Sequence, residues 1–103
     1  MLTQAKGLTM AEHRAPVVEV YSRKGCHLCD EAIETISALQ TDEVSFSLSV
    51  IDIEGDDELH REYLERIPVV AVNGVEVAEL EVVPHQVRAV IVSAASIAPN
   101  VND

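Results

Sequence analysis

A chain of 103 residues, 48% of them hydrophobic, has enough apolar material for one compact domain and too little length for two independent cores. Its 18 acidic residues outnumber its 7 basic ones and give a formal net charge of −11. This charge argues against nucleic acids and anionic membrane surfaces as partners, because both are bound through clustered Lys and Arg. No apolar run approaches the roughly 20 residues that cross a bilayer, so no membrane partner is predicted.

The two ends of the chain lack the periodicity of its body. Residues 1–15 are expected to form a flexible arm, residues 16–96 the folded domain, and residues 97–103 a flexible tail. The first sixteen residues lack the continuous apolar segment of a secretory signal, so a reducing cytoplasmic location is expected. In that compartment two cysteines serve catalysis or metal binding more often than a structural bridge.

The first half of the chain predicts a strand, a helix and a second strand. Residues 17–22 form a β-rich run that ends at Gly25. A helix from His27 to about Leu39 is predicted, because apolar residues recur there at the 3.6-residue period. The run 46–53 alternates as a strand, and its apolar end at Ile51–Ile53 favours a place in the middle of a sheet.

The second half predicts a short helix, a hairpin and a last helix. Asp56 or Asp57 is the expected N-cap of a helix that runs to about Arg66. Strands over 69–72 and 75–81 are joined by Asn73-Gly74, a dipeptide suited to a type I′ turn, and Pro84 fits the start of the last helix. The predicted order is β-α-β-α-β-β-α: a four-stranded mixed sheet flanked by helices, with the first two strands parallel and the hairpin antiparallel.

Cys26 and Cys29 carry the chemistry, because they stand where the first strand meets the first helix. At a helix N-terminus, unpaired N–H groups and the positive end of the dipole stabilise a thiolate on Cys26, and Arg23 and Lys24 add positive charge nearby. Cys29 lies one turn further on the inward face. The spacing therefore predicts an attacking thiolate at Cys26 and a resolving thiol at Cys29.

The layout resembles the thioredoxin superfamily, and within it the glutaredoxin-like branch. The resemblance covers about residues 17–95. It rests on the stretch from Val18 through Cys29, on Ile67-Pro68-Val69 and on Asn73-Gly74. It implies a thioredoxin-like α/β fold and thiol–disulfide exchange with protein or low-molecular-weight disulfides, in the service of cell redox homeostasis. No resident cofactor is implied, and glutathione enters only as a candidate reductant.

The resemblance also implies roles for residues around the cysteines. Pro68 is expected to be cis and to pack against them, with Ile67 offering its backbone N–H and C=O to an extended substrate. Arg23 or Lys24 would replace the basic residue that meets glutathione in glutaredoxins. Those proteins have a glycine pair after the hairpin, whereas this chain has Ala78-Glu79-Leu80-Glu81-Val82, with two carboxylates where an anionic tripeptide would dock.

Two alternatives stay open at this point. His27 either stabilises the Cys26 thiolate as a protonated imidazole and assists substrate binding, or is a solvated residue of the first helical turn. The cysteine pair could also hold zinc, monovalent copper or a bridging iron–sulfur cluster, although no further cysteine is present to complete a tetrahedral site. The redox protein is the favoured interpretation, acting as a monomer on a disulfide-bearing protein or a small thiol.

Overall fold

The computed structural model describes residues 15–100, and the side chains of residues 15–95. The elements follow one another as β1 (Val17–Ser22), α2 (His27–Ser37), β2 (Ser47–Asp52), the 3₁₀ turn η1 (Ile53–Gly55), α3 (Asp57–Tyr63), β3 (Val69–Val72), β4 (Val75–Glu79) and α4 (Pro84–Asn100). This is the predicted order, with helix and strand ends that differ by a few residues.

The four strands form one mixed sheet in the order β2-β1-β3-β4. The strand β1 pairs in parallel with β2 and antiparallel with β3, and β3 pairs antiparallel with β4. Asn73 and Gly74 both take positive φ, 51° and 86°, as a type I′ turn requires. The predicted four-stranded mixed sheet is thus confirmed.

The predicted place of β2 in the middle of the sheet was wrong, because β2 is an edge strand. Val50 is 51% exposed, and most of the strand faces solvent. The apolar signal came from Ile53, which lies just beyond the strand in η1. There Ile53 is fully buried beside Cys29 and Ile67.

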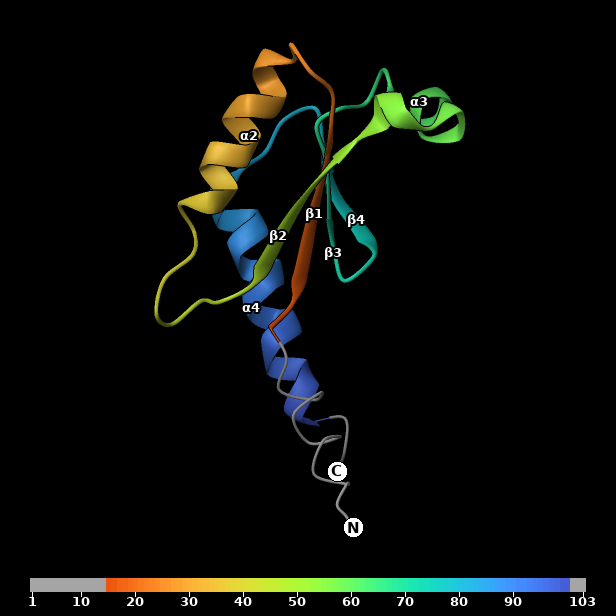
Figure 1. Cartoon of the computed structure of the whole chain (residues 1–103). Helices are drawn as coiled ribbons and strands as arrows, with labels where there is room; N and C mark the ends of the chain where they lie inside the picture. The colour runs from red at the N-terminus through yellow and green to blue at the C-terminus, as the bar shows by residue number, and fades with distance from the viewer. Residues whose placement is uncertain (1–14, 101–103) are drawn as a thin grey trace.

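The main core lies between the sheet and the helices α2 and α4, which flank the same side of the strands in Figure 1. Val18 and Val20 of β1 point into it, as do Ile36 of α2 and Ile91 of α4, and none of these is more than 1% exposed. The alternation along β1 and the 3.6-residue period along the helices place these side chains on facing surfaces.

A smaller cluster forms at the end of the sheet where α3 lies apart from the other two helices (Figure 1). Cys29, Ile53 and Ile67 are its buried members, and Leu59 and Tyr63 of α3 pack against them. The Tyr63 ring stacks on Tyr21 of β1, with centroids 4.3 Å apart. This cluster joins the turn that carries Cys26 and Cys29 (residues 25–29, the cysteine turn) to the segment before β3.

The helix α4 continues to Asn100, four residues past the boundary expected at residue 96. Residues 1–14 of the predicted arm and residues 101–103 of the predicted tail lie outside the described residues. Within the described part, no helix combines the length and apolar composition needed to cross a membrane.

Candidate functional site

Cys26 is the N-cap of α2. Its backbone is extended, with φ −89° and ψ 106°, and its sulfur accepts a hydrogen bond from the N–H of Cys29 at 3.1 Å. Gly25 takes φ 83°, a conformation that favours glycine, and so turns the chain out of β1 and into the helix. The thiol sulfur therefore lies at the positive end of the helix dipole, where negative charge is stabilised.

Cys29 lies one turn along α2 and is fully buried, whereas Cys26 is partly exposed. The two form a disulfide with 5.2 Å between their Cα atoms. The pairing brings together the two residues for which the sequence predicted joint chemistry. Their unequal exposure makes Cys26 the residue of the pair that a partner molecule can contact.

The segment before β3 lies against the cysteine turn, and the Ile67–Pro68 bond is cis, as the resemblance implied. The resemblance implied that Ile67 offers its backbone N–H and C=O to a substrate, and in this structure the N–H has an internal partner. That N–H donates to the C=O of Tyr63 at 3.1 Å, because it closes the end of α3. The C=O of Ile67 accepts no hydrogen bond from the described residues, so it alone is free for a substrate strand.

Arg23, Lys24 and His27, the residues near Cys26 that were predicted to assist binding, differ in their surroundings. Arg23 forms an ion pair with Glu54 of η1 at 2.7 Å, so its charge is turned toward that carboxylate. Lys24 and His27 are exposed beside the cysteine turn. Arg23 is therefore poorly placed to receive an anionic ligand, while Lys24 and His27 remain on the surface next to Cys26.

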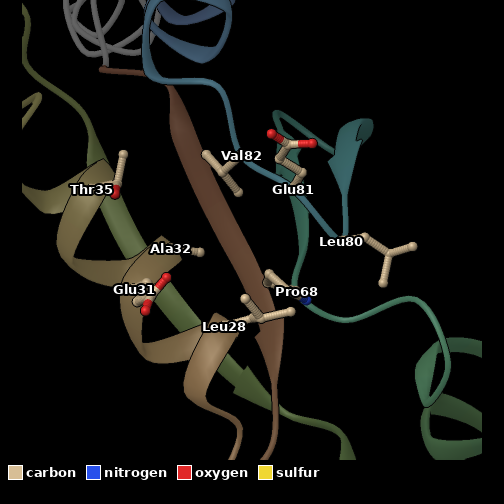
Figure 2. Close-up of a pocket in the computed structure, with 8 residues that line it drawn as sticks. All are labelled: Leu28, Glu31, Ala32, Thr35, Pro68, Leu80, Glu81 and Val82. Atoms are coloured by element: carbon tan, nitrogen blue, oxygen red, sulfur yellow. The ribbon is translucent and has the colours of Figure 1, made fainter.

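A groove of about 410 Å³ opens beside the cysteine turn, between α2 and the segment that follows β4 (Figure 2). One wall is a face of α2, the other is the chain after β4, and Pro68 lies between them, with Leu28 reaching toward it (Figure 2). Its lining residues are Leu28, Glu31, Ala32, Thr35, Pro68, Leu80, Glu81 and Val82. Within residues 15–95, whose side chains the structure describes, the lining is mainly apolar and includes two carboxylates but no basic side chain.

Sequence reasoning missed most of this groove. Leu28, Glu31, Ala32 and Thr35 follow one another at helical spacing, and that spacing could have identified them as one face of α2. Of the two carboxylates expected near a docked tripeptide, Glu81 lines the groove. Glu79 instead forms an ion pair with Arg66 at 2.8 Å.

Arg66 links the end of α3 to β4, the strand that leads into the second wall of the groove. Its guanidinium binds Glu62, Glu76 and Glu79, and it lies over the Tyr63 ring at 5.1 Å. Hydrogen bonds from Arg66 and then Tyr63 lower the pKa of Glu76, while burial and the hydrogen bond to Glu76 raise the pKa of Tyr63 to about 12.

Leu80 continues this wall in a left-handed conformation, with φ 67°. Its N–H donates to the C=O of Pro68 at 2.9 Å and to that of Arg66 at 3.1 Å. A leucine in this region is strained relative to glycine, and such strain persists only where the surroundings fix the backbone. The result is a leucine side chain, 48% exposed, on the rim of the groove.

A metal centre was the alternative role for the cysteines. Among the described residues, no group of three or more His, Cys, Asp and Glu side chains is arranged to hold a metal ion. The described part of one chain therefore offers the cysteine pair without the further ligands that a closed tetrahedral zinc site uses.

Comparison with known proteins gives consistent matches. Residues 17–94 match the model of the Glutaredoxin-like domain (DUF836). The uncharacterized protein Rv0508 of Mycobacterium tuberculosis is 34% identical over 79 residues, which are 72% of this chain and 80% of that protein. The solution structure of protein Ne2328 from Nitrosomonas europaea is 32% identical and superposes with a TM-score of 0.66, covering 76% of this chain and 93% of that one.

The oxidised thioredoxin of Plasmodium falciparum is also similar in structure, with a TM-score of 0.55 over 90% of this chain and 93% of that one. At 15% identity this likeness concerns the fold alone. The family match spans most of the sequence, from β1 into α4, and includes the cysteine turn and the cis-proline segment. The chain therefore belongs to the glutaredoxin-like domain family and has the thioredoxin fold.

Proposed function

We propose that this protein is a thiol–disulfide oxidoreductase in which Cys26 and Cys29 cycle between dithiol and disulfide. The observation that carries the proposal is the asymmetry of the pair at a helix N-terminus. Cys26 is partly exposed and accepts the Cys29 N–H, while Cys29 is fully buried one turn away and within bonding distance. A merely structural bridge would not require one sulfur to be presented at the dipole end of a helix beside a groove.

The reaction starts from the reduced pair. The Cys26 thiolate attacks one sulfur of a substrate disulfide, a new S–S bond forms, and the other substrate sulfur leaves as a thiolate that takes up a proton. Cys29, as its thiolate, then attacks the Cys26 sulfur and displaces the second substrate thiol. Two electrons pass to the substrate, and the Cys26–Cys29 disulfide remains.

An external thiol or dithiol reverses these steps and returns the pair to the reduced state. Glutathione is a candidate for this role, and no resident cofactor is required. We expect the protein to work as a monomer in the cytoplasm, where reducing conditions suit such a cycle and a contribution to redox homeostasis. Its partners would be disulfide-bearing proteins or small thiols.

The first test is to trap the mixed disulfide with 2-hydroxyethyl disulfide, which is small and uncharged. Reduced Cys29→Ser should accumulate an adduct at Cys26, because no resolving thiol is left to release it. The matched variant, Cys26→Ser, should form at least about tenfold less adduct in the same time, because the remaining sulfur is buried. Equal labelling of the two variants in mass spectra would contradict the assigned division of roles.

A further inference from the structure

The apolar lining and the charges of the groove beside the cysteines bear on which disulfide substrates the protein accepts. This inference rests on the proposed function. Leu28 and Leu80 are 54% and 48% exposed on its rim, and Pro68, Ala32 and Val82 continue the apolar lining. Exposed leucines on a groove next to the cysteine turn offer an apolar surface to a partner, which water would otherwise cover. The volume, about 410 Å³, lies in the range of ordinary ligand sites.

The conformation of Leu80 strengthens this argument. The chain holds a leucine at φ 67°, where glycine would be free of strain, and fixes it with two hydrogen bonds to the segment around Pro68. Strained residues concentrate at functional sites. Keeping a large apolar side chain at this position is consistent with a contact to a bound substrate.

The charges of the groove define the polar part of the substrate. Glu31 projects from α2 and Glu81 from the opposite wall, and none of the described residues that line the groove is basic. Arg23 is paired with Glu54, and Lys24 and His27, which are exposed beside Cys26, lie outside the lining. The net charge of −11 adds a field of the same sign.

We propose that the groove binds an extended segment of a protein substrate in which apolar and basic residues flank the reacting cysteine, and that it disfavours glutathione disulfide. Glutathione carries more carboxylates than amines, so Glu31 and Glu81 would repel it. A Lys or Arg beside the substrate cysteine would instead form ion pairs with these carboxylates, while an adjacent Leu would pack against Leu28 and Leu80. The C=O of Ile67 is available to the backbone of such a segment.

The test measures how fast the reduced protein reduces two symmetrical peptide disulfides and glutathione disulfide. The peptides have Leu before the cysteine and differ only after it, with Lys in one and Glu in the other. The wild-type protein should react with the Lys peptide about tenfold faster than with the Glu peptide, as two partly exposed charge pairs allow. It should also prefer the Lys peptide to glutathione disulfide.

The matched variants separate the groove from the overall charge. Glu31→Gln/Glu81→Gln should reduce the preference for Lys over Glu to about threefold or less. Glu34→Gln/Glu43→Gln removes the same charge from exposed positions outside the groove and should keep the wild-type preference. An equal loss of preference in both double variants, or no preference in the wild type, would overturn the inference.

A third peptide, with Gly in place of Leu, tests the apolar contact. Leu28→Ala should lower the advantage of the Leu–Cys–Lys peptide over the Gly–Cys–Lys peptide by about threefold, because the rim loses part of its apolar area. If Leu28→Ala keeps the full advantage of the Leu peptide, the rim leucines do not contact the substrate.

Dithiothreitol separates the two proposals: if the pair cycles with dithiothreitol but no peptide is preferred, only this inference fails. A pair that does not cycle overturns both.

Discussion

Leu80 is the residue at which the backbone departs most clearly from what its side chain prefers. Its φ of 67° lies in the left-handed region, and its side chain lines the groove beside Pro68. The sequence offered no sign of this, because the positions that usually adopt positive φ carry Gly or Asn, as Gly25 and Asn73 do here. The conformation is imposed by the bonds of the Leu80 N–H to Pro68 and Arg66.

The strain at Leu80 predicts an unusual order of stability for two variants. Leu80→Gly should be more stable than Leu80→Ala by about 1 kcal/mol, because glycine adopts positive φ freely and alanine does not. At Val92, an exposed position inside α4, the order should be reversed by about the same amount, since glycine is a poor helix former. Urea unfolding of the four variants measures both differences. A Leu80→Ala protein as stable as Leu80→Gly would show that the position is unstrained.

The different exposure of the two cysteines could be predicted from the sequence. Their spacing and their place before a helical stripe predicted an exposed Cys26 and a shielded Cys29, and the burial of Cys29 agrees. The partner of Arg23 could not be predicted, since Glu54 lies in a 3₁₀ turn reached only through the folded sheet. Long-range ion pairs of this kind depend on tertiary contacts that no local pattern encodes.

At the scale of elements, Arg66 and its carboxylates link the end of α3 to β4, the strand that leads into the second wall of the groove. Glu76 accepts hydrogen bonds from Arg66 and from Tyr63, whose hydroxyl donates at 3.0 Å, and these lower the pKa of Glu76 below its usual 4.5. The network is half exposed, so its contribution to stability is modest.

This lowered pKa gives the network a defined pH dependence. The ionised Glu76 is favoured in the folded state, so its contribution is present above about pH 4.5 and is lost as the pH falls through the lower folded-state pKa. At neutral pH, Glu76→Gln should lower the free energy of unfolding by less than about 1 kcal/mol, and the gap to wild type should close in acid.

Chemical denaturation at pH 7 and at pH 3.5 tests this, with Glu34→Gln as the matched control. Glu34 is exposed on α2 and forms no ion pair with a described residue, so the control should stay close to wild type at neutral pH. A gap between Glu76→Gln and wild type that widens in acid would contradict the role of the ionised carboxylate.

The periodicity of the sequence predicted the helices and strands well, but it predicted their positions relative to one another less well. The stripe in α2 and the alternation in β1 identified the core faces, because both follow directly from backbone geometry. The edge position of β2 was missed, since Ile53 makes its end look apolar although that residue turns away into the smaller cluster. An apolar run indicates that its residues are buried. Which element they are buried against depends on the tertiary packing, which the run alone does not reveal.

At the scale of the whole molecule, the predicted order of elements, the mixed sheet and the thioredoxin fold are confirmed. The order and the mixed sheet could be predicted because the rules for crossovers and hairpins leave few topologies for these elements. The thioredoxin fold itself was implied by the resemblance of the cysteine turn and the Ile67-Pro68 segment to that superfamily. The groove was not predicted as a whole. It arises only where α2, Pro68 and the chain after β4 meet, and these three segments are distant in sequence.

The proposed function depends most directly on whether Cys26 and Cys29 form a reversible redox couple. The decisive measurement equilibrates the protein in dithiothreitol buffers of graded redox poise and then counts free thiols by alkylation and mass spectrometry. The account predicts one two-electron transition between dithiol and disulfide, absent from both Cys26→Ser and Cys29→Ser. If no intramolecular disulfide forms at any poise, or if the transition survives in either variant, thiol–disulfide exchange by this pair is contradicted.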